Sequence, residues 1–376
     1  MAINRRAVLG LAASGLVSLA GGAWSAVPRR SEHRYLGIRY RRTLREFVAV
    51  VADSAGRSLH EIILPGRGHD VVARPGTRDA VVIARRPNTF AIAFDIDGEG
   101  APLSFRTPFN RHFLGHAAFD AEGRLLFASE NDFDRGRGVI GVYDAKDRYR
   151  RLGEFPSYGI GPHQLVMASD RRTIAVANGG IFTHPDSGRA KLNIPTMKPS
   201  LAYIDIQSGQ LLDRVTMPQG RRRKLSTRHL ALLPGDRIAV ACQDEGPRND
   251  LMSLVGIHTP GTGIIQELTA PDAVMRTMAG YCGAITADTA GEILAVSAPR
   301  GNLVVFWHVT SVEYLGMTFI ADGCGVAPGP RPGTFALTSG GGVFAIHNPK
   351  RQRGVAAPAT STPRAPWDNH LTRIVL

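Results

Sequence analysis

Cysteine and tryptophan are both scarce in this sequence, with three copies of each in 376 residues. An odd number of cysteines leaves at least one of Cys242, Cys282 and Cys324 unpaired, which excludes a framework of several disulfides. A single bridge between two of them stays open, and nothing in their spacing requires it. They also form no Cys-x2-Cys pair, the local motif of many structural zinc sites. Aromatic residues make up only 7% of the chain, and no basic stretch interleaved with aromatics indicates a nucleic-acid-binding motif.

Acidic residues are outnumbered, because 32 Asp and Glu stand against 45 Lys and Arg, which gives a formal net charge of +13. A basic balance favours an anionic partner. The positive residues are nevertheless scattered along the chain, apart from the runs Arg221–Lys224 and Lys350–Arg351. We therefore predict a solvated basic surface and no nucleic-acid partner.

The first residues have the pattern of an export signal. Arg5 and Arg6 precede a run of apolar and small residues that continues to about Ala26, and Leu9 stands three positions after Arg6. Paired arginines in this position resemble a twin-arginine signal. We predict a signal peptide over residues 1–26, a periplasmic location and no membrane span after cleavage. The alternative is an uncut N-terminal anchor helix.

A repeated pattern organises the rest of the chain. His116 is followed by a short strand pattern, the polar turn 120–124 and a second strand pattern at 125–129. The same pattern follows His69 and His163, and each step between these histidines is 47 positions. A fixed period of this length, with several short strands in each unit, is typical of a β-propeller.

Counting the repeats predicts the number of blades. Seven positions can open a unit: His69, His116, His163, His229, Cys282, Cys324 and His370. Three strand patterns precede the first of them, at 34–40, 47–51 and 59–64, and only one strand, 371–376, follows the last. The two chain ends together therefore supply one blade, which closes the ring and removes an exposed edge. We predict an all-β, seven-bladed β-propeller of the WD40/YVTN-like type over residues 34–376.

The strand directions gather unusual side chains at one opening of the central channel. In a four-stranded blade, the start of the first strand and the end of the second lie on the same face. His69, His116, His163, His229 and His370 are therefore candidate metal ligands, and imidazole suits iron, copper or zinc. The candidate ligand-binding residues are Arg85, Arg86, Glu130, Asn131, Asn178, His184, Arg189 and Gln243. The long insertion 182–199, which carries two of them, can cover this opening.

Each of these residues also has a purely structural interpretation. A histidine at a blade start can hydrogen-bond the backbone of the neighbouring blade, and Cys282 and Cys324 fit small packed residues. Arg85 and Arg86 can clamp a carboxylate or phosphate, or pair with Glu130. Glu130 and His163 are candidate acid–base residues of an enzyme, but Glu130 is also a natural salt-bridge partner among so many arginines.

Several longer motifs resemble those of one bacterial family. They are Gly-His-Asp at 68–70, Ala-Arg-Arg-Pro at 84–87, Glu-Asn-Asp-Phe at 130–133, Gly-Ile-Gly-Pro-His at 159–163, Thr-His-Pro-Asp-Ser-Gly-Arg at 183–189 and Trp-Asp-Asn-His at 367–370. The sequence resembles a family of exported propellers, a domain of unknown function with a twin-arginine signal, over nearly all of the mature chain. The family is often encoded beside imelysin-type iron-regulated proteins and di-haem peroxidase-like proteins.

The resemblance implies a periplasmic role near iron or haem acquisition, with imelysin-type proteins as possible partners, and it supplies no catalytic residues. We therefore predict a binding module that holds a metal, a metal complex or a partner protein at its histidine-rich opening. The alternative is a periplasmic hydrolase or oxidoreductase that uses the same opening.

Overall fold

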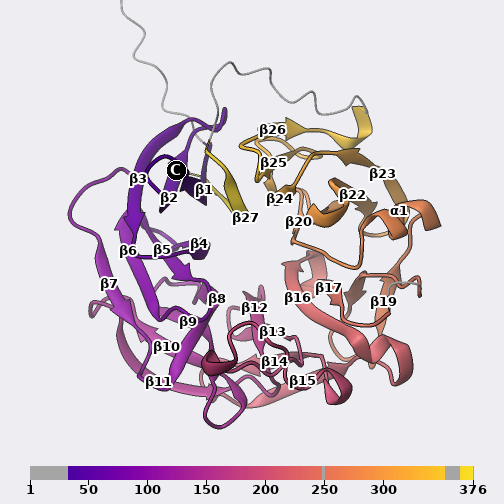
Figure 1. Cartoon of the computed structure of the whole chain (residues 1–376), viewed down its shortest axis with the longest axis horizontal. Helices are drawn as coiled ribbons and strands as arrows, with labels where there is room; N and C mark the ends of the chain where they lie inside the picture. Colours follow the sequence, from indigo (N-terminus) through magenta and orange to yellow (C-terminus); the bar gives the residue numbers. More distant parts are fainter. Residues whose placement is uncertain (1–32, 248–249, 352–364, 376) are drawn as a thin grey trace, which may run out of the picture. The chain divides into compact units, whose positions relative to one another are not determined.

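The chain from His33 onward forms seven small antiparallel sheets arranged as the blades of a propeller (Figure 1). The structure is a computed structural model that describes residues 33–247, 250–351 and 365–375. The predicted signal peptide and most of the linker before the last strand lie outside these residues. The innermost strand of each blade contacts the innermost strands of its two neighbours, so the ring is closed. The predicted fold class is confirmed.

The first four blades contain four strands each. From the centre outward, the first consists of β27 (Trp367–Val375), β1 (His33–Arg41), β2 (Glu46–Ala52) and β3 (Ser58–Leu64). The second consists of β4 (Gly68–Ala73), β5 (Asp79–Ala84), β6 (Phe90–Asp95) and β7 (Leu103–Arg106). The third consists of β8 (Arg111–Phe119), β9 (Leu125–Asp132), β10 (Arg137–Asp144) and β11 (Arg150–Pro156). The fourth consists of β12 (Pro162–Met167), β13 (Thr173–Asn178), β14 (Ser200–Asp205) and β15 (Leu211–Thr216).

The last blade differs from the others in having three strands. The fifth blade consists of β16 (Leu225–Leu232), β17 (Ile238–Asp244), β18 (Val255–His258) and β19 (Ile265–Leu268). The sixth consists of β20 (Ala284–Ala287), β21 (Ile293–Ala298), β22 (Leu303–His308) and β23 (Tyr314–Phe319). The seventh consists of β24 (Gly323–Pro328), β25 (Phe335–Ser339) and β26 (Phe344–His347). The short helix α1 (Asp272–Thr277) and six 3-10 turns, at 185–187, 194–196, 220–224, 234–236, 299–301 and 349–351, complete the described elements.

The two chain ends share the first blade, as predicted. Strand β27 pairs antiparallel with β1, from His33 opposite Val375 to Arg39 opposite Trp367. Arg39 also stacks its guanidinium on the Trp367 ring, 3.8 Å from the centroid. Backbone pairing and this stacking contact therefore join the two chain ends. The ring closes in this way without an exposed strand edge between β27 and β1.

The turns opposite the repeat headers have an ordinary β-turn chemistry. In the third blade, Asp120 accepts hydrogen bonds from the backbone of Arg124 and Leu125, which closes the turn between β8 and β9. Gly123 has a φ of 62°, and a Cβ atom there would lie 2.8 Å from the carbonyl oxygen of Pro75. Glycine is therefore required in this turn both by the backbone conformation and by the approach of the neighbouring blade.

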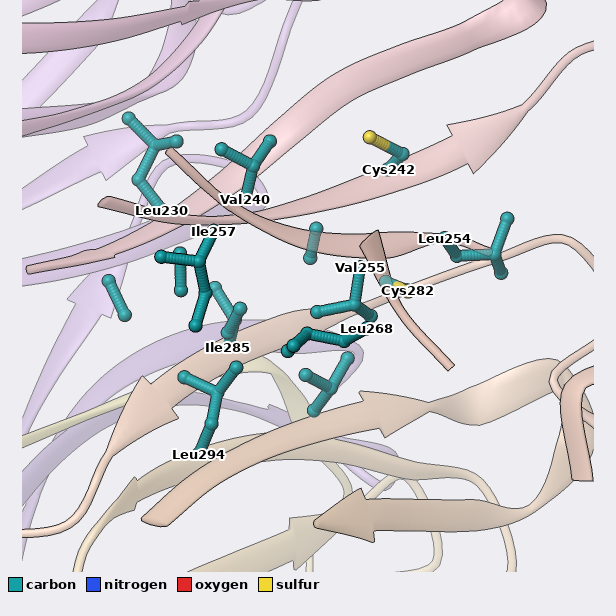
Figure 2. Packing of buried hydrophobic residues seen from close by; sticks show 14 of the residues in the cluster. Leu230, Val240, Cys242, Leu254, Val255, Ile257, Leu268, Cys282, Ile285 and Leu294 are labelled. Atoms are coloured by element: carbon teal, nitrogen blue, oxygen red, sulfur yellow. The ribbon is translucent and has the colours of Figure 1, made fainter. Parts of the chain in front are cut away.

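Apolar side chains fill the spaces between blades. Figure 2 shows the contact between the fifth and sixth blades, where Leu230, Val240 and Ile257 pack toward Ile285 and Leu294. Cys242 and Cys282 belong to the same cluster, and Cys324 belongs to the cluster between the seventh and first blades. All three thiols are buried and free, and burial raises the pKa of Cys242 and Cys324 to about 12. The cysteines are therefore neutral packing residues.

Within the residues that the structure describes, no helix has the length and apolar character needed to cross a membrane.

Candidate functional site

The five header histidines meet at the centre of the ring. We call His69, His116, His163, His229 and His370 the histidine layer. The imidazole of His116 has its centroid 4.9 Å from that of His69, 4.8 Å from His163 and 4.6 Å from His370. His229 lies 4.7 Å from His163 and 4.9 Å from His370. Residues that are up to 301 positions apart in sequence, as His69 and His370 are, thus form one contiguous cluster.

Irregular strand pairing directs these residues to the centre. The register between the two innermost strands shifts between Gly68 and Asp70, which leaves His69 outside the ladder. Similar shifts between Phe113 and Ala117, and between Pro162 and Leu165, leave His116 and His163 outside it. A β-bulge of this kind bends the strand and re-aims a side chain. His370 lies in the shift between β27 and β1, and in the fifth blade Arg228, next to His229, is the bulged residue.

Gly115 provides the space in which two of the imidazoles meet. Its φ is 113°, in the region that favours glycine, and a Cβ atom there would lie 2.1 Å from Cδ2 of the His69 ring. Any larger side chain at this position would displace His69 from the histidine layer.

His116 is the central member, and its two ring nitrogens have different environments. Nδ1 lies 2.8 Å from Oδ2 of Asp70, so it donates its proton to that carboxylate. The opposite nitrogen, Nε2, is therefore a lone-pair acceptor. It is buried and has no hydrogen-bond partner among the described residues. His116 itself is 0% exposed.

The other members also present free ring nitrogens. Within the described part of the chain, His69 and His163 each have a buried Nδ1 without a partner, and His370 has a buried Nε2 without one. His229 points its Nδ1 at Oε1 of Gln164, at 3.3 Å, and thereby leaves Nε2 as the acceptor. Two sets of three offer ligand atoms that all lie within 4.8 Å of one another: His69, His116 and His163, and His116, His229 and His370. Such donor sets are what a metal ion requires.

Burial keeps four of these imidazoles neutral, namely those of His69, His163, His229 and His370. Burial is the main cause that lowers the pKa of His370 to about 3. Burial and the neighbouring imidazoles or arginines also lower the pKa of His69, His163 and His229 well below the usual value. Burial alone would raise the pKa of Asp70, but the hydrogen bond from His116, together with the other contacts of this carboxylate, outweighs burial and lowers that pKa. The cluster therefore combines neutral nitrogen ligands with one ionised carboxylate behind them.

A basic pocket opens on one side of the histidine layer. It has a volume of about 460 Å³ and includes His69, His163 and His229 in its lining. Its charged wall consists of Arg67, Arg85, Arg86, Arg189, Lys191, Arg228 and Arg300. No aspartate or glutamate lines this pocket, which we call the arginine pocket. The 182–199 insertion contributes Thr183, Arg189 and Lys191 to it.

A second pocket lies on the opposite side of the layer. It has a volume of about 650 Å³ and is lined mainly by the β-turns at 232–235 and 286–291 and by parts of the inner strands. His370 and Asp70 belong to this lining, whereas His69, His163 and His229 belong to the arginine pocket. The histidine layer therefore lies between the two openings rather than at one of them.

Half of the predicted ligand-binding residues line the arginine pocket. Arg85, Arg86, Arg189 and Gln243 do so, whereas Glu130, Asn131, Asn178 and His184 do not. Glu130 is 0% exposed and accepts hydrogen bonds from Tyr143, at 2.5 Å, and Arg151, at 2.9 Å, inside the third blade. Its structural interpretation as a salt-bridge partner is the one that the contacts fit.

The reason for this position is the length of β8. The sequence predicts that this strand starts next to His116, but the strand begins at Arg111. The end of β9 therefore pairs with residues that precede His116 in β8. Glu130 lies opposite Phe113, and Asn131 lies opposite His112. Asn131 donates to Thr183, Asn178 donates to Ser157, and His184 accepts from Asp186 within its own loop. These three polar residues thus stabilise loops.

Four cations of the arginine pocket were not among the predicted ligand-binding residues: Arg67, Lys191, Arg228 and Arg300. Arg67 and Arg228 stand just before the headers His69 and His229, and Arg300 follows β21 in the sixth blade. Position relative to a header is the signal that would have found Arg67 and Arg228. His112 precedes His116 by four positions, yet it contacts Phe113 and Asn131 and is not part of the histidine layer.

A family model described as "Protein of unknown function (DUF1513)" matches residues 62–374. The chain belongs to this family. Membership agrees with the resemblance noted in the sequence, while twin-arginine export and imelysin-type neighbours stay predictions. No curated protein matches the sequence.

Solved structures that share the fold come from proteins of very different kinds. A chain from Kuenenia stuttgartiensis hydrazine synthase is 12% identical, with a TM-score of 0.60 over 80% of this chain and 89% of that one. A chain of the Mitotic Checkpoint Complex is 12% identical, with a TM-score of 0.54 over 92% and 85%. A chain of a Nidogen/Laminin complex is 11% identical, with a TM-score of 0.53 over 91% and 98%. At these identities the likeness shows the propeller fold alone.

Proposed function

We propose that this propeller binds a first-row transition-metal ion in the histidine layer. The observation that carries the proposal is the geometry of His116. Its Nδ1 donates to Asp70, its Nε2 is buried without a partner among the described residues, and His116 is common to both three-histidine sets. Metal-binding histidines characteristically donate the other ring N–H to a carboxylate, which fixes the tautomer and orients the ligand nitrogen.

The donor set narrows the class of metal. The cluster offers neutral imidazole nitrogens, and no cysteine belongs to either three-histidine set. Imidazole ligation suits copper, zinc and iron, whereas magnesium and calcium prefer oxygen ligands. Copper, zinc and iron are therefore the ions to test.

The enzyme alternative receives less support. Its acid–base candidate Glu130 is enclosed in the third blade and does not line either pocket beside the histidine layer. His163 remains a metal-ligand candidate because it lines the arginine pocket and belongs to one of the three-histidine sets.

We further propose that the protein works in the periplasm, near iron or haem acquisition, with imelysin-type proteins as partners. The support is the Arg5-Arg6 signal pattern and the resemblance of the sequence to exported propellers with such neighbours. The mature protein should be found in the periplasmic fraction. It should be missing from that fraction when Arg5 and Arg6 are both replaced by Lys.

The metal proposal is tested by elemental analysis and calorimetric titration of the full-length exported protein. Metal-free protein should bind copper(II), zinc(II) or iron(II) saturably. The His116→Ala variant should lose that binding, because it removes the histidine common to both sets. His347→Gln is the matched control, since His347 is also buried but lies outside the histidine layer, stacked on Phe306.

Circular dichroism and melting temperature must show that the two variants are folded. Absence of saturable binding of all three ions to the wild-type protein would overturn the proposal. So would equal binding by wild type and a folded His116→Ala variant.

A further inference from the structure

We propose that the arginine pocket binds a small organic polycarboxylate, and that one of its carboxylates also ligates the metal in the histidine layer. The first part concerns the pocket alone, and the second part rests on the metal site proposed above. Together they identify the physiological ligand class as a metal–polycarboxylate complex rather than a bare ion.

The first observation is an unbalanced charge. Of the seven cations in the wall, Arg67 pairs with Asp368 and Lys191 pairs with Glu245. The other five make no ion pair with any described residue: Arg85, Arg86, Arg189, Arg228 and Arg300. These five guanidinium groups surround a pocket that no carboxylate lines, so their positive charges repel one another. An anionic ligand would offset this unfavourable electrostatic energy.

The environment of individual arginines is consistent with this repulsion. Burial, followed by the charges of Arg228 and Arg189, lowers the pKa of Arg86 to about 10. Burial and the charge of Arg67 likewise lower the pKa of Arg85. Arg228 donates to Gln243, at 3.1 Å, but its Nε is buried without a partner. These arginine side chains are partly desolvated, and N–H donors among them remain available to a ligand.

The distribution of the arginines favours a ligand with several anionic groups. Arg85 and Arg86 follow β5, Arg228 lies in β16, and Arg189 comes from the 182–199 insertion. Arg300, stacked on Tyr281 with 4.6 Å from its guanidinium carbon to the ring centroid, comes from the sixth blade. A single orthophosphate would contact one part of such a wall, whereas a di- or tricarboxylate can bind guanidinium forks from several elements at once.

The position of the histidine layer connects this ligand to the metal. His69, His163 and His229 are part of the same pocket lining as the arginines. A ligand bound to the arginines is therefore next to the proposed ligand nitrogens. Carboxylate oxygens are good ligands of zinc, copper and iron, so one carboxylate can bind the metal while the others remain on the arginines. The volume of about 460 Å³ lies in the range of small-molecule sites.

The experiment measures binding of tricarballylate, a tricarboxylate that chelates free metal weakly, by calorimetry to metal-free and zinc-loaded full-length protein. Saturable binding is expected in both forms, tighter in the zinc-loaded form and weaker at high salt. The double variant Arg85→Gln/Arg86→Gln should weaken binding at least about tenfold, because it removes two charge-assisted donors.

The control has the same change in net charge. Arg42 and Arg45 lie in the exposed turn between β1 and β2 and do not line the arginine pocket. Arg42→Gln/Arg45→Gln should therefore bind tricarballylate within about twofold of wild type, since only long-range electrostatics change. Melting temperatures of both double variants establish that they are folded.

The outcomes separate this inference from the metal proposal. If zinc binds but tricarballylate does not, the inference is wrong and the metal site stands. If tricarballylate binds through Arg85 and Arg86 but no metal binds, the pocket assignment stands, and both the metal site and its link to the carboxylate fail. Orthophosphate or sulfate binding as tightly as tricarballylate would overturn the polycarboxylate assignment. His116→Ala should abolish the zinc-dependent gain and leave the arginine-dependent binding.

Discussion

Two buried polar regions of this propeller, the ionic network of the third blade and the histidine layer, differ in how their groups are paired. In the ionic network of the third blade, Glu130 pairs with Arg151, Glu154 with Arg111, and Asp132 with Arg137. In the histidine layer, four of the five rings have a buried nitrogen without a partner among the described residues. Buried polar groups in folded proteins are normally satisfied, so an unsatisfied cluster points to a ligand, whereas a paired one points to stability.

The comparison shows why residue type alone is a poor guide to function. Glu130 and His116 are both 0% exposed, and both look like catalytic or ligand residues in the sequence. They differ in their partners, because both carboxylate oxygens of Glu130 accept hydrogen bonds, whereas Nε2 of His116 has no partner among the described residues. The predictions that follow test whether the ionic network of the third blade stabilises the fold and whether the histidine layer binds the metal.

The largest effect is expected from Glu130→Ala. It leaves Arg151 and the Tyr143 hydroxyl without their buried acceptor, so the free energy of unfolding should fall by roughly 3 kcal/mol, as measured by urea denaturation. The metal content of the folded variant should equal that of wild type. Loss of metal at unchanged stability would reverse the roles assigned to the two regions.

The second effect is expected from Asp70→Asn. The amide cannot accept the Nδ1–H of His116 as strongly as the carboxylate does, so the basicity and orientation of Nε2 are impaired. Metal affinity should fall by about 10- to 100-fold in a competition titration. Asp120→Asn is a matched control, because Asp120 closes a turn in the same blade as His116 and is also buried; its metal affinity should not change.

A smaller effect is expected from pH. Burial would raise the pKa of Glu154, but its contacts with Arg111 and Arg151 outweigh this and lower it from 4.5 to about 2. Because the folded-state pKa is depressed, the contribution of Glu154 is present above pH 4.5 and is lost as the pH falls towards 2. Relative to Glu154→Gln, wild type should be more stable by about 1 kcal/mol near neutral pH after allowing for solvent screening.

That advantage should shrink as the pH drops below 4.5, as followed by denaturation at a series of pH values. An advantage that instead grows in acid would contradict the assignment of Glu154 to the ionic network.

The smallest effect is expected from the cysteines. Their sulfurs are buried, and burial raises the pKa of Cys242 and Cys324 to about 12, so native protein should not react with a thiol reagent at mildly alkaline pH. Unfolded protein should show three reactive thiols per chain. The number of reactive thiols should be the same for metal-free and metal-loaded protein. Fewer reactive thiols in the metal-loaded protein would indicate that sulfur binds the metal.

The repeat could be predicted because it depends on short-range patterns in the sequence. Histidine spacing, turn residues and strand alternation together predict seven blades and the shared first blade, which the sheets of Figure 1 confirm. Each of these features depends on neighbours within a few residues, or on a count of similar units.

The site was harder to predict because it depends on register and on which side chains lack partners. The bulges that leave His69 and His163 outside the ladder are not visible in the sequence, and neither is the early start of β8 that encloses Glu130. The pairing of Arg67 with Asp368 joins residues 301 positions apart, so the sequence could not separate it from the unpaired Arg85 and Arg86.

The central claim is that imidazole nitrogens of the histidine layer hold a metal ion. X-ray absorption spectroscopy of the metal-loaded, full-length protein tests it most directly. The account predicts a first shell of nitrogen and oxygen ligands with the outer-shell scattering of several imidazoles, and loss of that imidazole signal in His116→Ala. A first shell containing sulfur, or one without imidazole scattering, would contradict it.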